Sequence, residues 1–130
     1  MLTDIGIRVT MNVPYEQAVE QTTEALTAAG FGVLTQIDMK VRLKQKADAD
    51  FRRHVILGTC PPPALLAAST QRDGRLLLPC NVTVYEEGDS SVVAAVDPVK
   101  MLGAFKDDPV AREVAVDAKT RLQRAIASLE

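Results

Sequence analysis

Apolar and polar side chains alternate through the first segment of the chain. The apolar positions of this segment are Ile5, Ile7, Val9, Met11 and Val13. A period of two is typical of a strand with one buried face. Pro14 then suits the first turn of a helix, and apolar positions recur at helical spacing until Gly30, a residue that favours a helix end. The sequence therefore predicts a strand followed by a helix.

A second alternating segment covers residues 31–39, and its start directly after the helix predicts a tight return onto the first strand. Residues 40–50, "KVRLKQKADAD", fit either the alternation of a strand or a short helix. We favour the helix because Asp38 is a suitable N-terminal cap and apolar residues recur four apart. The run "RHVILGT", residues 53–59, is expected to form a buried strand.

In the second half of the chain, three prolines are expected to start a short helix over residues 63–71. Residues 75–98 predict a hairpin that turns between Glu87 and Ser90. Residues 99–105 predict a short turn or helix, and Pro109 is placed to begin a long helix. The apolar stripe expected on that long helix is Val110, Val114, Ala118, Leu122, Ile126 and Leu129.

This order of elements predicts an α+β fold of the β-α-β(4)-α type. We expect a curved, mostly antiparallel sheet with helices packed on one face. The chain has 130 residues, which is the size of one domain and large enough to bury a hydrophobic core. We therefore expect a single domain over residues 1–130.

Charge and composition narrow the choice of partners. The 15 basic and 17 acidic side chains leave a net charge of −2, so nothing draws the whole chain toward nucleic acid or an anionic membrane. The basic stretch at residues 40–53 is interrupted by acidic residues, and the chain has five aromatic residues and no tryptophan. We therefore expect a solvated face there and no nucleic-acid partner. Without a recognisable signal peptide or membrane span, a cytoplasmic location is expected, where thiols stay reduced.

The two cysteines are the main candidates for chemistry, because each stands beside a proline at the end of an apolar run. If their strands are antiparallel neighbours, Cys60 and Cys80 would lie close enough to share a pocket. Such a pair would permit a reversible disulfide, persulfide handling or binding of a soft metal such as Cu(I) or Zn(II). A full set of metal ligands is hard to complete within one chain, because the chain has one histidine and no Cys-x-x-Cys motif.

Each cysteine also has a simpler interpretation. Cys60 precedes a predicted helix N-terminus that would favour its thiolate, but the prolines remove the backbone donors that would stabilise the charge. Cys80 shares a strand face with Val82 and Val84, so it is expected to pack in the core. Asp97, which ends a strand, would either contact a pocket or bond to its own turn, and we favour the turn.

Four segments carry a family resemblance. They are "GFGVL" at 30–34, "ILGTC" at 56–60, "LLPCNVTVYE" at 77–86 and "VDP" at 96–98. In this order, and over nearly the whole chain from about Ile5, they resemble the bacterial and archaeal family called domain of unknown function 302. The two cysteine segments are the most specific part of the match.

The resemblance implies a fold related to the TATA-binding-protein type, and a homodimer. It implies no established activity and no particular cofactor. Members of that family commonly follow the first cysteine with Asn-Pro, whereas Cys60 is followed here by Pro61. An asparagine amide is therefore missing beside Cys60, and the site is better supported at Cys80 and Asn81.

Two hypotheses follow. In the first, the protein binds a small ligand, a soft metal or a thiol-reactive group at a two-cysteine pocket. The candidate residues for that pocket are Cys60, Cys80, Asn81, Tyr85 and Asp97. In the second, it is a structural or protein-interaction homodimer whose cysteines only fill the core. An enzyme with Cys60 as its nucleophile is a narrower form of the first hypothesis.

Overall fold

The computed structural model describes residues 5–60, 80–101, 103 and 107–130. Within these residues, five strands and four helices follow one another in an α+β arrangement, as predicted. In chain order they are β1 (Gly6–Met11), α1 (Tyr15–Ala28), β2 (Gly32–Asp38), α2 (Met39–Ala47), β3 (His54–Cys60), β4 (Cys80–Glu87), β5 (Ser90–Val96), α4 (Pro98–Met101) and α5 (Pro109–Ala127). The predicted helix over residues 63–71, the start of the hairpin at 75–79 and most of 102–106 lie outside the described residues.

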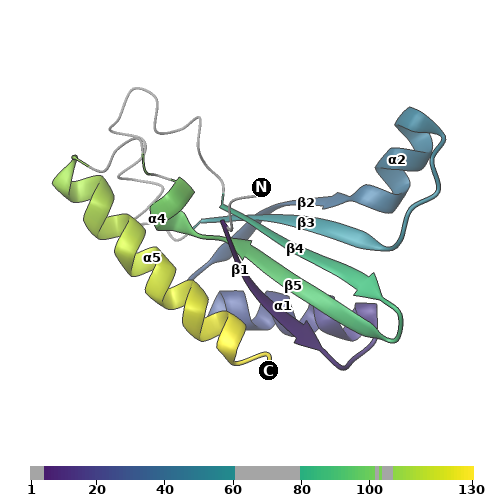
Figure 1. Cartoon of the computed structure of the whole chain (residues 1–130), viewed down its shortest axis with the longest axis horizontal. Coiled ribbons are helices and arrows are strands. Elements are labelled where there is room, and N and C mark those ends of the chain that lie inside the picture. The colour runs from purple at the N-terminus through teal and green to yellow at the C-terminus, as the bar shows by residue number, and fades with distance from the viewer. Residues whose placement is uncertain (1–4, 61–79, 102, 104–106) are drawn as a thin grey trace.

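The five strands form one sheet with the order β1-β5-β4-β3-β2, and every neighbouring pair is antiparallel. The expected return of β2 onto β1 is therefore wrong, because these two strands lie at opposite edges of the sheet (Figure 1). The hairpin β4–β5 lies between them, with β5 against β1 and β4 against β3. The predicted hairpin itself is confirmed, with Gly88 and Asp89 between its strands.

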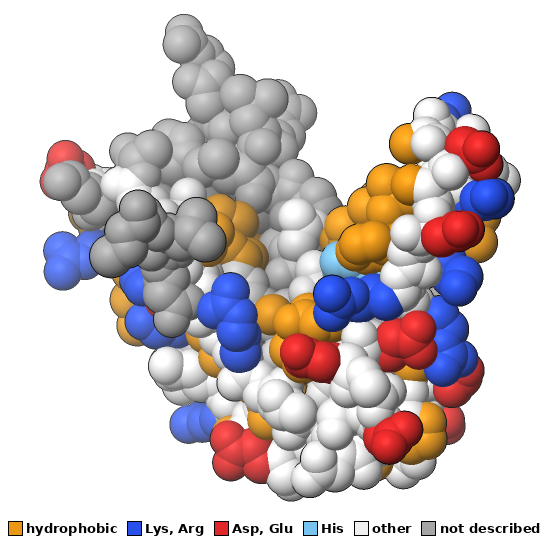
Figure 2. Space-filling view, turned by 45° about the vertical axis from the view of Figure 1, so that its right-hand side comes forward, with side chains coloured by type: hydrophobic (Ala, Val, Ile, Leu, Met, Phe, Trp, Pro, Cys, Tyr) orange, Lys and Arg blue, Asp and Glu red, His pale blue; other side chains and the backbone are white. Residues whose placement is uncertain are grey.

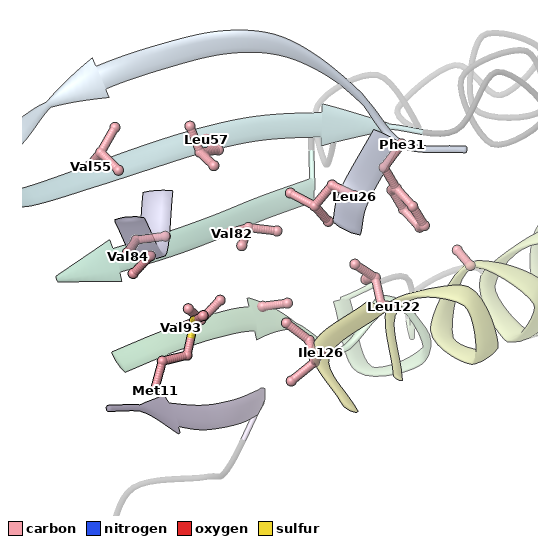
Figure 3. Packing of buried hydrophobic residues seen from close by; sticks show 13 residues of the cluster. Met11, Leu26, Phe31, Val55, Leu57, Val82, Val84, Val93, Leu122 and Ile126 are labelled. Carbon is pink, nitrogen blue, oxygen red and sulfur yellow. The ribbon is translucent and has the colours of Figure 1, made fainter. Parts of the chain in front are cut away.

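Helices α1 and α5 pack on one face of this twisted sheet (Figure 1). The side chains that alternate toward this face meet the buried sides of both helices, and Figure 3 shows the resulting core. The core residues are Met11, Ala18, Leu26, Phe31, Val55, Leu57, Val82, Val84, Val93, Ala95, Ala118, Leu122 and Ile126. We call the opposite side of the sheet the outer face, and its cross-strand neighbours include Tyr85 with His54 and Thr83 with Ile56.

Local chemistry sets the ends of the two core helices. Helix α1 follows Pro14 and is terminated at Gly30, which adopts a φ of 87° that a glycine reaches without strain. Helix α5 begins at Pro109, and the Asp108 carboxylate accepts hydrogen bonds from two backbone amides of the first turn. Val110 is 59% exposed and lies outside the buried stripe that the sequence predicted for α5. In Figure 1 the first turn of α5 extends past the sheet, and the core residues of α5 begin only at Ala118.

The ambiguous segment after β2 is a helix, as we favoured. The backbone amide of Val41 donates to the Asp38 carboxylate (3.1 Å), and α2 ends at Asp48, whose φ is 48°. We call residues 38–53 the arm, because α2 and its connection to β3 project from one end of the sheet (Figure 1). Among the helices of the described residues, none is long and apolar enough to cross a lipid bilayer.

Candidate functional site

The structure places the two cysteines on neighbouring antiparallel strands, which was the condition for a shared pocket. Cys60 ends β3, Cys80 begins β4, and Thr59 is the residue directly opposite Cys80. Because side chains alternate along a strand, Cys80 points to the face covered by α1 and α5, whereas Cys60 leaves the sheet on the outer face beside Gly32. The two sulfur atoms therefore start from opposite sides of the sheet.

Both cysteines are free thiols and both are buried, with exposed fractions of 4% for Cys60 and 2% for Cys80. Burial raises the pKa of the Cys60 thiol. Burial also raises the pKa of Cys80, to about 12, and a charge on Cys60 would raise it further. Both groups are therefore protonated near neutral pH, which favours the packing interpretation over an activated thiolate.

The other two candidate residues of β4 do not lie on the same face of the sheet as Cys80. Asn81 is exposed and Tyr85 is half-buried, and both point to the outer face, away from the Cys80 side chain. The Thr59 hydroxyl donates a hydrogen bond to the Cys80 backbone carbonyl (3.2 Å), so the polar group nearest Cys80 on β3 already has a partner. The candidate set predicted from the sequence is thus divided between the two faces of the sheet.

Asp97 acts as a cap and an ion-pair partner. Its carboxylate accepts hydrogen bonds from the backbone amides of Val99 (2.9 Å) and Lys100 (3.4 Å), and its second oxygen lies 3.0 Å from Lys119 Nζ. Burial alone would raise the pKa of Asp97, but the hydrogen bonds and the Lys119 charge outweigh it and lower the pKa. Asp97 therefore caps α4 and joins it to α5, which agrees with the turn interpretation.

The described residues contain no group of three or more His, Cys, Asp or Glu side chains arranged to hold a metal ion. A shallow groove of about 890 Å³ runs between the end of α1 and α5, but none of the candidate residues lines it. Arg121 in this groove is paired with Asp117 (3.0 Å).

A cluster that the sequence reasoning missed lies on the outer face, where the arm meets β3 and β4. The imidazole of His54 stands between two aromatic rings, with ring centroids 5.8 Å from Phe51 and 5.6 Å from Tyr85. The guanidinium carbon of Arg52 lies 5.9 Å from the Phe51 centroid and 5.3 Å from the Tyr85 centroid. We call these four residues the aromatic–arginine cluster. The run "FRRH" at 51–54 was the available signal, but its approach to Tyr85 depends on the β3–β4 register.

Exposed apolar side chains continue from this cluster onto the arm. Phe51 is 38% exposed, Ile37 on β2 is 40% exposed and Val41 on α2 is 48% exposed. Figure 2 shows apolar side chains along the inner side of the arm, with the chain's single histidine at its foot and basic side chains next to it. The outer face thus combines apolar surface, aromatic rings and positive charge in one hollow.

Comparison with other proteins places the chain in a family. The family profile described as "Domain of unknown function DUF302" matches residues 7–129. A similar solved structure is that of the uncharacterized conserved protein DUF302 from Bacillus stearothermophilus, with a TM-score of 0.85 and 26% sequence identity, covering 98% of this chain and 100% of that one. No functionally curated protein matches the chain. Since the family profile spans nearly the whole sequence, the chain belongs to the DUF302 family.

Proposed function

We propose that this domain binds a small organic ligand on the outer face beside the arm, and that Cys60 and Cys80 serve mainly to pack the sheet. The observation that carries this proposal is the aromatic–arginine cluster, which is accessible, whereas both thiols are buried. Small-molecule sites commonly combine apolar and aromatic walls with a few convergent polar groups. The cluster has that composition.

The position of the aromatic residues adds support. The chain has five aromatic residues, and Phe31 is buried in the core. Phe51 and Tyr85 instead each contact the His54 ring on the outer face, and neither belongs to the hydrophobic core. An exposed apolar patch flanked by charged side chains is typical of a binding surface, because it gains little for folding and favours association.

The two-cysteine pocket is the second candidate. One observation favours it: the thiols lie on adjacent strands and are close enough for the charge of one to raise the pKa of the other. Binding of a soft metal or a thiol-reactive group would require the strand ends at Cys60 and Cys80 to open, because both thiols are buried and protonated. This requirement makes the outer face the better-supported site.

The homodimer implied by the family resemblance stays a prediction. The outer face is one surface on which a second copy of the chain would bind. Self-association and ligand binding would then involve the same residues. A dilution series of the free protein, followed by analytical ultracentrifugation, separates the two cases before any ligand is added.

A fragment screen by amide NMR on the full ¹⁵N-labelled chain tests the proposal. We expect saturable shifts that gather on the arm, the start of β3 and the end of β4. Phe51→Ala should weaken the binding, whereas Val116→Ala, which removes a 51% exposed apolar side chain from α5, should not. Fragments that bind only in the groove between α1 and α5, or that lose binding on Cys60→Ala, would contradict the proposal.

A further inference from the structure

We infer that the ligand class of the outer face is a planar aromatic anion, which stacks at the aromatic–arginine cluster with its acidic group on Arg52. The inference rests on the proposed function and names the chemistry that the site recognises. Four features carry it: the position of Arg52, the absence of a carboxylate partner for it among the described residues, the unpartnered nitrogen of His54 and the positive charge of the arm.

Arg52 is held in place by aromatic rings. Its guanidinium lies over both Phe51 and Tyr85, at distances within the range of a cation–π contact. A planar guanidinium in this position presents N–H donors that match a carboxylate, sulfonate or phosphate group. The neighbouring rings offer a surface on which the flat part of the same ligand stacks.

The neighbouring Arg53 is engaged differently. Arg53 pairs with Glu16 of α1 and Glu86 of β4 and lies over the Tyr15 ring, so it fastens the helix to the sheet on the covered face. For Arg52, the described residues supply no carboxylate within ion-pair distance. Among these residues Arg52 contacts aromatic rings and no carboxylate, so an added anion would not have to displace an acidic side chain of this part of the chain.

His54 supplies a second polar group. Within the described residues, its Nε2 atom is buried and has no hydrogen-bond partner. Burial lowers the pKa of His54, and the Arg52 charge lowers it further, so the ring is neutral near pH 7. An unpaired buried polar atom is unfavourable. With its proton on Nε2, the neutral ring would donate a hydrogen bond to an anionic oxygen, so a ligand whose acidic group reached this atom would relieve that cost.

The charge distribution agrees with an anionic ligand. The arm, residues 38–53, carries six basic and three acidic side chains, and without Arg53, which is paired on the covered face, its net charge is +2 in a chain whose net charge is −2. Ile37 and Val41 add exposed apolar surface beside this charge. A locally positive hollow with apolar walls favours a ligand that is both flat and negative.

The test compares two probes of the same shape, 2-naphthoate and the uncharged 2-naphthamide, by amide NMR titration of the full chain. We expect naphthoate to shift the amides of the cluster and to bind about tenfold more tightly than naphthamide, as a charge-assisted hydrogen bond predicts. Arg52→Gln should remove this difference, and Arg52→Lys should restore part of it. Arg112→Gln, which changes an exposed arginine on α5, is the matched control and should leave both affinities unchanged.

The outcomes separate the inference from the proposed function. If both probes bind the outer face equally in the wild-type protein, or if Arg112→Gln acts like Arg52→Gln, the anion class is wrong but the binding face stands. If neither probe shifts the outer face, both ideas fail. If dilution alone shifts the outer-face amides, a second copy of the chain occupies the surface and the small-ligand class is overturned.

Discussion

Cys80 should be among the least reactive thiols that a folded protein of this size presents. Its side chain is 2% exposed and lies on the covered face beside Val82 and Thr59, and its pKa is raised from the ordinary 9.0 to about 12. At pH 8 a thiol with the ordinary pKa is about one-tenth thiolate, whereas a thiol with a pKa near 12 is about one part in ten thousand. We therefore expect alkylation to slow by about a thousandfold from this cause alone.

The assay is alkylation with iodoacetamide at pH 8, followed by peptide mapping to resolve the two sites. The same protein in denaturant gives the reference rate for each thiol, and Cys60, whose pKa is also raised by burial, should be slow as well. A rate for native Cys80 within tenfold of its denatured rate would refute the reasoning. Such a rate would mean that the start of β4 opens to solvent. The two-cysteine pocket would then be the better-supported candidate site.

Three further predictions concern stability, each measured by urea denaturation. Asp97→Ala should lower the free energy of unfolding by about 1–3 kcal/mol, because it removes the cap of α4 and leaves Lys119 without its partner; a change below 0.5 kcal/mol would show that the pair contributes nothing. The lowered pKa of His54 means that the unfolded chain binds its proton more readily, so stability should fall as pH drops through about 6.5, and this dependence should weaken in His54→Gln. Leu122→Ala should lower the free energy of unfolding by about 2–5 kcal/mol, whereas Val116→Ala, at an exposed position, should lower it by less than about 0.5 kcal/mol. Equal effects would contradict the packing of α5 through Leu122.

Local patterns predicted the elements well, because alternation and helix caps act over a few residues. The alternation of β4, the helix over α2 and the start of α5 at Pro109 were all visible in the sequence. The pairing of the strands was not visible in the sequence. A period of two shows which side of a strand is buried, but it does not determine which other strand lies beside it. That is why β2 was expected beside β1, where the structure places β5.

The candidate site was predictable only in part, for the same reason. The shared pocket depended on Cys60 and Cys80 lying on neighbouring strands, which they do, but their side chains point to opposite faces because Thr59 is the residue opposite Cys80. The contact between Arg52 and Tyr85 joins residues far apart in the chain. It depends on the β3–β4 register, which no local pattern specifies.

The central claim is that the domain binds through its outer face and not through its thiols. The most direct test is an amide NMR titration of 2-naphthoate into the wild-type protein and into the double variant Cys60→Ala/Cys80→Ala, after circular dichroism has shown that the variant is folded. The account predicts that both proteins bind with dissociation constants within about threefold of each other and that the same amides around His54 and Tyr85 shift. Loss of binding in the double variant, or shifts confined to the ends of β3 and β4, would contradict it.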